Sequence, residues 1–388
     1  MRRLLVLVSA MIFFDVAFFA AIAPLLPDYV EDLDLTKAEA GILSASYAAG
    51  TLAASLPAGF VASRLGPRRT AIYGLLLLGV SSFVFGFAEQ ILLLDAARFI
   101  QGIAGALIWA GALTWLITTA PEDKRGTYIG AALGTAVGGA LLGPVLGAGA
   151  AEIGTEVVFS SVLVVTLLLS LAASRMPDTT TPERQTRGEV VRTLVSRPIV
   201  AASIFVAVPS VMFGAIEVLV PLRMDDLGAG HALIAAGFVA GAALEATLAP
   251  LSGRMSDRVG RRLPYMIGLS ICSVAMVAIA FVPNLEELLA SLILTSLGAG
   301  LCFAPALTLI SDIAEASSLH QGFAAGLSNM AWALGQVIGG IGGGVVAEVT
   351  GNVAPSLAIS LLLAITVLYA YRVMQSISEP PPTSGNLV

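Results

Sequence analysis

The stretch Gly59–Arg69, GFVASRLGPRR, stands between two long apolar runs and returns in altered form as Gly253–Arg262, GRMSDRVGRR. The first glycines of the two copies lie 194 residues apart, from residue 59 to residue 253. Each copy combines glycines suited to a turn with a cluster of basic side chains. The offset of 194 residues is half of the 388-residue chain, which indicates two related halves.

The composition around these copies is that of a membrane protein. Hydrophobic residues make up 57% of the chain and charged residues only 12%, with a mean hydropathy of +0.91. Soluble domains carry about 25% charged residues. The two cysteines, Cys272 and Cys302, lie in apolar segments, so we expect no disulfide. The two histidines and the absence of a Cys/His cluster in the sequence predict no metal site.

Twelve apolar runs are long enough to cross a bilayer, which takes about 20 residues in a helix. We expect the first run to be a retained helix and not a signal peptide, because it is too long and contains Asp15. The predicted fold is an all-α membrane protein of twelve transmembrane helices in two six-helix, pseudo-symmetric halves. The halves are residues 1–174 and 199–376, with a cytoplasmic linker over 175–198 and a disordered tail over 377–388. The expected spans are 4–27, 41–63, 70–88, 92–119, 127–151, 156–174, 199–223, 232–253, 263–283, 287–311, 321–347 and 353–374.

The basic residues predict the orientation, because loops rich in Lys and Arg stay in the cytoplasm. With a cytoplasmic N-terminus, 17 of the 20 Lys and Arg residues fall on the cytoplasmic side. The exceptions are Lys37 and Arg223 on the outer side and Arg98 inside a span. We therefore expect both termini in the cytoplasm and a location in a prokaryotic cytoplasmic membrane.

At these repeats the chain resembles the major facilitator superfamily, over essentially its whole length. Both copies are similar to that family's gating-loop motif, although Ser63 stands where the family usually has the Asp that Asp257 retains. Basic side chains on the rim can pair with carboxylates or helix C-termini in one access state. The alternative is that they only set the topology. The residues of the gating motif are Gly59, Arg64, Gly66, Arg68, Arg69, Gly253, Asp257, Arg258 and Gly260.

Two further motifs resemble those of the twelve-helix drug:proton antiporters within that superfamily. Leu94–Ala106, LDAARFIQGIAGA, is similar to their fourth-helix motif, and Gly138–Ala148, GGALLGPVLGA, to their fifth-helix antiporter motif. Glycines spaced four residues apart allow a neighbouring helix to approach closely, and a proline can bend the helix. The antiporter motif comprises Gly139, Gly143, Pro144 and Gly147, and we expect Gly130 and Gly134 on the same face.

The first helix, with Asp15, Pro24, Pro27 and Tyr29, resembles that of bacterial multidrug and vesicular monoamine transporters. The segment Ala215–Met224 resembles the seventh helix of the vesicular amine carriers. The resemblance implies a carboxylate associated with cationic substrate at Asp15 and a second family carboxylate at Glu217. The match weakens elsewhere, since Tyr47 stands where the amine carriers have a lysine and Asn329 where they have an aspartate. The class of transporter therefore carries over, but the exact substrate does not.

Ionisable side chains inside the spans are candidates for substrate and proton binding, because their burial is costly. Asp15 lies about 17 Å into a hydrocarbon core about 30 Å thick, so we place it at the midplane, in the cavity between the halves. There it can alternate between a proton and an organic cation. Glu245 lies about 13 Å from the cytoplasmic end of its span, and Glu217 lies nearer the outer end. For each carboxylate, the alternative role is a hydrogen bond within the bundle.

Other polar side chains in the spans are candidates with weaker signals. Arg98 either tunes the proton affinity of Asp15 or Glu217, or extends to the outer interface. Gln101, Asn329 and Gln336 either orient substrate or bond neighbouring helices. Tyr47 offers a cation–π surface, as do Phe18, Phe19, Trp109, Trp115 and Trp332, with core packing as the alternative for each.

Together these features predict a proton-coupled antiporter that exports an amphipathic, cationic small molecule, a drug or an amine, by alternating access. We expect no enzymatic activity and no cofactor, because the sequence has no phosphate-binding loop of the Gly-x4-Gly-Lys-Ser/Thr type, and the proton gradient would supply the energy. The expected partners are the substrate, protons and the lipid bilayer, without nucleic acid, and the protein is expected to be a monomer. Two alternatives stay open: a symporter or uniporter that imports a neutral or anionic solute such as a sugar, and a transporter-like sensor that binds without translocation.

Overall fold

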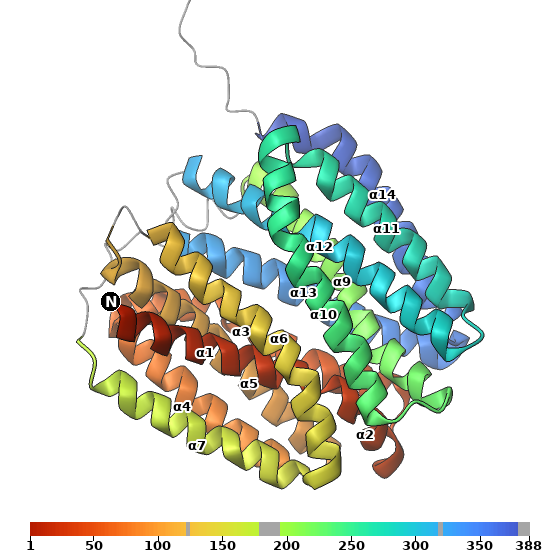
Figure 1. The fold of residues 1–388 in the computed structure, drawn as a ribbon, viewed down its shortest axis with the longest axis horizontal. Coiled ribbons are helices and arrows are strands. Elements are labelled where there is room, and N and C mark those ends of the chain that lie inside the picture. Colours follow the sequence, from red (N-terminus) through yellow and green to blue (C-terminus); the bar gives the residue numbers. More distant parts are fainter. Residues whose placement is uncertain (122–124, 178–194, 317–320, 379–388) are drawn as a thin grey trace, which may run out of the picture.

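The computed structural model of the protein describes residues 1–121, 125–177, 195–316 and 321–378. These residues are helical apart from short turns, and no strand occurs among them (Figure 1). The first half contains α1 (Arg2–Ala20), the 3₁₀ turn η1 (Ala23–Leu25), α2 (Leu26–Asp32), α3 (Lys37–Leu65), α4 (Pro67–Gly86), α5 (Ile91–Thr119), α6 (Arg125–Ile153) and α7 (Thr155–Ser174). The second half contains α9 (Arg197–Asp226), α10 (His231–Val259), α11 (Arg262–Phe281), α12 (Leu285–Ala316), α13 (Gln321–Thr350) and α14 (Val353–Ser378).

Twelve helical spans result when α1, η1 and α2 are counted as one interrupted span, which confirms the predicted fold. By length and composition, eleven of the spans are apolar enough to cross a membrane. The remaining one, α3, is more polar because serine and glycine recur along it. Most of the predicted linker, residues 178–194, and of the predicted tail, residues 379–388, lies outside the described residues.

The first span is broken, although the sequence predicted one continuous helix over 4–27. α1 ends at Ala20, a single 3₁₀ turn follows, and α2 begins at Leu26. Pro24 and Pro27 have no backbone N–H to continue the helical ladder. Carbonyl groups in the last turn of α1 therefore need other donors.

Each half has its own apolar core. One cluster of buried side chains comes from the helices between Leu4 and Ala173, joined by Val218 and Leu222 of α9, and the other comes from the helices between Ile199 and Met374. In Figure 1 the red-to-yellow helices of the first half lie beside the green-to-blue helices of the second. The halves meet where α3 packs on α13 and α6 packs on α10.

Glycines let α3 and α13 meet backbone to backbone. A methyl group built on Gly41 would lie 2.5 Å from the carbonyl oxygen of Gly340 and 3.3 Å from the Cα atom of Gly344. Closer to the other end of these helices, the rings of Phe60 and Phe323 are 5.6 Å apart. We call this contact between the halves the α3–α13 seam.

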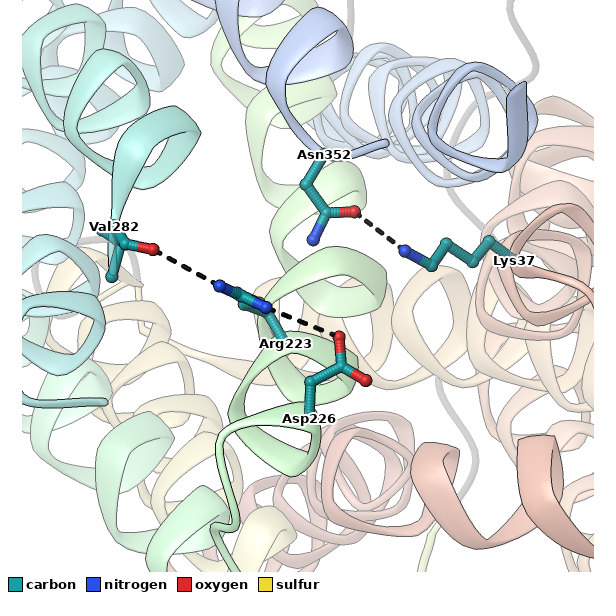
Figure 2. Close-up of polar contacts among 5 residues, drawn as sticks. All are labelled: Lys37, Arg223, Asp226, Val282 and Asn352. Carbon is teal, nitrogen blue, oxygen red and sulfur yellow. Dashed lines mark hydrogen bonds and ion pairs between the residues drawn. The ribbon is translucent and has the colours of Figure 1, made fainter. Parts of the chain in front are cut away.

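The two halves are also bonded at one end of the bundle. We call it the distal end; it carries the turns at residues 33–36, 227–230, 282–284 and 351–352, whereas the proximal end carries the beginning of α1 and the end of α14. Nε2 of His231 lies 2.6 Å from a carboxylate oxygen of Asp28. The backbone N–H of Lys37 donates to the carboxylate of Glu348 at 2.7 Å, and its ammonium group donates to Asn352 at 3.3 Å (Figure 2). These three contacts close the distal end.

The two basic residues predicted outside the cytoplasm, Lys37 and Arg223, lie on this same end (Figure 2). They line a pocket of about 240 Å³. Arg223 lies 3.9 Å from the carboxylate of Asp226 and donates to the carbonyl oxygen of Val282 at 3.5 Å. Arg223 thus ties the last turn of α9 to the end of α11.

Candidate functional site

Asp15 is enclosed by neutral hydrogen-bond donors of the first half. It is 1% exposed, and its Oδ1 accepts a hydrogen bond from the Tyr47 hydroxyl at 3.0 Å. Its Oδ2 accepts from the indole N–H of Trp109 at 2.9 Å. Gly105 makes room for this arrangement, because a methyl group there would lie 2.9 Å from Oδ1 of Asp15. Both oxygens of the carboxyl group therefore have protein partners.

Arg98 lies beside this group and binds the broken end of α1. The residue is 1% exposed, and its guanidinium donates to the carbonyl oxygens of Phe18 at 3.4 Å and Phe19 at 3.3 Å. It also donates to the side chain of Gln101 at 3.2 Å and lies 5.2 Å from the ring centre of Tyr47. No ion pair joins Arg98 to a carboxylate in the described part of the chain. Instead, Arg98 supplies side-chain donors to carbonyl groups of the last turn of α1, where helical carbonyls lack partners.

A cavity of about 350 Å³ lies between the halves, lined by residues of α1, α6, α9, α10, α12 and α13. Two half-buried carboxylates, Glu217 of α9 and Glu245 of α10, are in its wall. Gln336, 3% exposed, donates from Nε2 to Glu217 at 3.4 Å. The described lining includes no Lys or Arg. Aromatic rings form much of the wall: Phe19, Phe213, Phe238, Phe303 and Trp332.

Phe19 connects the Asp15 group to the cavity. Its ring centre is 4.9 Å from that of Tyr47, which bonds to Asp15. On its other side it makes an edge contact at 5.3 Å with Trp332 of the second half. A change around Asp15 can therefore reach the cavity wall through one shared ring.

The structure divides the predicted substrate and proton residues into two groups. Asp15, Tyr47, Arg98 and Gln101 gather in the first half, with Gln101 donating to Ser82 at 3.2 Å. In contrast, the cavity wall contains Glu217, Glu245 and Gln336, while Asn329 lies half-buried on α13 outside that wall. The sequence placed Asp15 in the cavity itself. It does not line the cavity, because Tyr47 and Trp109 enclose it from α3 and α5.

The two gating loops differ in their polar contacts. In the first loop, Arg68 donates to the carbonyl oxygens of Ser174 at 3.2 Å and Met176 at 2.7 Å, so a basic side chain meets the C-terminus of α7 as predicted. In the second, Arg261 pairs with Asp312. Both turns need glycine, since φ is +89° at Gly66 and +82° at Gly260. The remaining charged motif residues are exposed at the proximal end: Arg64, Arg69, Asp257 and Arg258.

The antiporter motif packs α6 closely against the first span. A methyl group on Gly143 would lie 2.6 Å from the carbonyl oxygen of Ala17, and methyl groups on Gly139 and Gly147 would collide with the carbonyls of Phe13 and Ala21. The predicted close approach is therefore confirmed at these three glycines. It is wrong for Gly130 and Gly134, where no described atom lies within 4 Å of such a methyl group. Pro144 lines the cavity, and α6 remains helical through it.

The first glycines of the two gating motifs differ in their surroundings: a methyl group on Gly59 would contact the ring of Phe323, whereas one on Gly253 would face open space.

Sequence reasoning gave too little weight to several residues of the site. Trp109, considered only as an aromatic surface, is a hydrogen-bond donor to Asp15. The spacing of Arg98, Gly102, Gly105 and Trp109 places them on one face of α5. That shared face could have indicated from the sequence that Trp109 lies with the other residues of the site. Phe213, Phe238 and Phe303 carried no comparable signal, because aromatic residues are common in apolar spans.

The sequence profile of the Major Facilitator Superfamily matches residues 7–245 and 204–387 of this chain. The chain belongs to the major facilitator superfamily. This major facilitator transporter is a multi-pass integral membrane protein, in line with its apolar helices.

Relatives and solved structures agree with that assignment. The transporter is 26% identical over 388 aligned residues to a chloramphenicol resistance protein of Streptomyces lividans. This alignment covers 94% of each chain. It is 27% identical over 109 residues to the quinolone resistance protein NorA of Staphylococcus aureus, and this match spans only 28% of each chain. The crystal structure of a bacterial homolog to the human lysosomal transporter Spinster, in an inward-facing and unoccupied conformation, superimposes with a TM-score of 0.79. That superposition covers 98% of each chain at 13% identity and shows a shared fold.

Proposed function

We propose that the protein exports an amphipathic, cationic small molecule in exchange for protons, by alternating access. The observation that carries the proposal is the cavity between the halves, with its aromatic walls, its two carboxylates and no Lys or Arg in the described lining. Aromatic faces and carboxylates both attract cations. Its volume of about 350 Å³ falls within the range for drug-sized ligands, about 300–1,000 Å³.

The relatives support a small organic drug as the class of substrate. The matched proteins are named for resistance to chloramphenicol and to quinolones. A cavity with aromatic walls suits such molecules, because flat rings bury apolar area and stack on one another. The carboxylates add a preference for positive charge.

Protons and the cationic substrate would compete for the same carboxylates, and this competition would couple their transport. A carboxylate that holds a proton no longer attracts a cation, so protonation of Glu217 or Glu245 favours release of substrate. We assign Asp15 to proton binding and not to substrate contact, because Tyr47 and Trp109 already bond to its two oxygens. Its protonation would weaken these bonds and act on the cavity through Phe19.

The contacts at the distal end support alternation between two access states. The positive-inside rule makes the distal end the outer side of the membrane. Opening the cavity to that side requires the halves to separate there, which breaks the pair of Asp28 and His231 and the bonds of Lys37. We therefore propose that these contacts close the outer gate.

Transport into proteoliposomes with an acidic interior tests the proposal, with ethidium as the probe. Protons leaving the vesicle should drive ethidium inward against its gradient, and an uncoupler should abolish this accumulation. Asp15→Asn should reduce the pH-driven rate by about a hundredfold or more, in the range of removing one proton-transfer group. Glu89→Gln, which removes an exposed carboxylate that does not line the cavity, should transport like the wild type.

Two outcomes contradict the proposal. Equal pH-driven transport by Asp15→Asn and the wild type would remove Asp15 from the coupling. Accumulation only when protons enter the vesicle would indicate symport, and so import.

A further inference from the structure

The centre of the bundle has an excess of negative charge. Among the residues that the structure describes, three carboxyl groups, those of Asp15, Glu217 and Glu245, lie there with one cation, Arg98. Arg98 interacts electrostatically with both Glu217 and Asp15, so its single charge is shared between them. Whichever carboxylate it balances, two negative charges remain. Unbalanced charge is costly where access to water is restricted, so bound protons or a bound cationic ligand would stabilise this region.

The two carboxylates of the cavity have different surroundings. Glu217, on α9, faces α13 and accepts from Gln336 at 3.4 Å. Glu245, on α10, lies where that helix packs on Gly300 of α12, and no described side chain bonds to it. Phe213 lies one turn before Glu217 on α9, and Phe303 lies about one turn after Gly300 on α12. Both line the cavity, and their ring centres are 5.4 Å apart. The cavity therefore has two separate negative positions joined by an apolar surface.

The side chain of Gln336 keeps one buried acceptor without a partner beside Glu217. Gln336 is 3% exposed and lines the cavity, yet its Oε1 has no hydrogen-bond partner among the described residues. A buried polar atom without a partner costs about 1–3 kcal/mol. The wall around Glu217 thus offers acceptors in excess of donors.

We propose that the cavity binds dications, with one positive charge at Glu217, the other at Glu245, and an aromatic body between them. This inference rests on the proposed function and narrows its substrate class. A monocation would occupy the position at Glu217 and leave Glu245 to a proton. Glu245 is then the residue that sets the preference between the two kinds of substrate.

Ethidium and propidium form a matched pair of probes for this proposal. They share one phenanthridinium ring system, and propidium carries a second, quaternary ammonium charge on a short arm. Their dissociation constants are measured by fluorescence, with the full-length protein in detergent at pH 8. The wild type should bind propidium at least about tenfold more tightly than ethidium, because the second charge meets a carboxylate in a medium of low dielectric.

Three variants locate the preference. In Glu245→Gln the ratio of the two dissociation constants should fall to about one, with ethidium binding changed less than about threefold. Glu245→Asp keeps the charge and should keep much of the preference. Glu89→Gln removes an exposed carboxylate outside the cavity and should leave both constants unchanged.

The outcomes separate this inference from the proposed function. If ethidium binds but propidium binds no more tightly, or if the preference survives in Glu245→Gln, the dication site is refuted and cation export stands. If neither dye binds or moves in the transport assay, the cationic cavity itself is refuted, and the dication site with it.

Discussion

At the scale of single residues, Asp15 shows how a carboxyl group is kept in the interior of a membrane protein. Two donors, the Tyr47 hydroxyl and the Trp109 indole, reach its oxygens from two different helices. Neither donor carries a charge, so the group can bind or lose a proton without breaking an ion pair. The donors also fix the side chain in place, which suits a group whose protonation must act on a neighbouring ring.

A double-mutant cycle tests the bond between Tyr47 and Asp15. Tyr47→Phe leaves one buried oxygen without a donor, so it should lower the free energy of unfolding by about 1–3 kcal/mol. In the Asp15→Asn background the loss should be smaller. Tyr265→Phe is the matched control, because that hydroxyl donates to the carbonyl oxygen of Phe205 in the other half. The free energy of unfolding is measured in mixed micelles for the wild type, the two single variants and the double variant. If the loss caused by Tyr47→Phe is the same with and without Asp15→Asn, the assigned bond is contradicted.

At the scale of elements, the beginning of α3 is fixed by a capping box at the distal end. The side chain of Thr36 accepts from the backbone N–H of Glu39 at 3.2 Å, and the backbone N–H and hydroxyl of Thr36 both donate to Glu39 at 2.9 Å. These bonds from Thr36 hold the pKa of Glu39 below its ordinary value of 4.5, and the bond from the backbone N–H has the larger effect. The next residue, Lys37, begins the helix and bonds to the other half.

The lowered pKa of Glu39 predicts a pH-dependent contribution to stability. A carboxyl group whose pKa is lower in the folded protein stabilises it above the unfolded pKa, and the contribution disappears as the pH falls through the folded pKa. Glu39→Gln should therefore lower the melting temperature at pH 7, and the difference from the wild type should shrink below pH 4.5. Intrinsic tryptophan fluorescence during heating measures this, with Glu89→Gln as the control. A difference that stays constant with pH contradicts the assignment.

The sequence was sufficient for the helices and their arrangement in halves, because apolar runs and a repeat are local patterns. It was insufficient for the break at Pro24, which sits inside an otherwise apolar run, and for the separation of Asp15 from the cavity. Depth along a helix can be counted from the sequence, but the direction of a side chain depends on partners such as Trp109, 94 residues away. For the same reason, Glu217 and Glu245 were identified individually, whereas their shared cavity was visible only in the structure.

At the scale of the whole molecule, the halves are bonded at the distal end by few contacts. The closest of them pairs His231 with Asp28 at 2.6 Å, where both side chains are partly exposed. Exposed ion pairs contribute about 1 kcal/mol or less. Contacts of this strength hold one access state closed while leaving it able to open.

Removing this pair should shift the molecule towards a distal-open state. Distances between spin labels on Asp34→Cys and Asn284→Cys measure the separation, since the two native cysteines are buried. His231→Ala should increase the distal-open population about twofold to fivefold, which corresponds to about 1 kcal/mol or less. An unchanged distance distribution would exclude a gating role.

The glycines of the α3–α13 seam have a mechanical consequence. Where Gly41 faces Gly340 and Gly344, no side chains interlock across the boundary. Two interlocked helices must change side-chain rotamers whenever one moves past the other, whereas two smooth backbones need not. The two halves can therefore tilt against each other along the seam with little rearrangement of side chains.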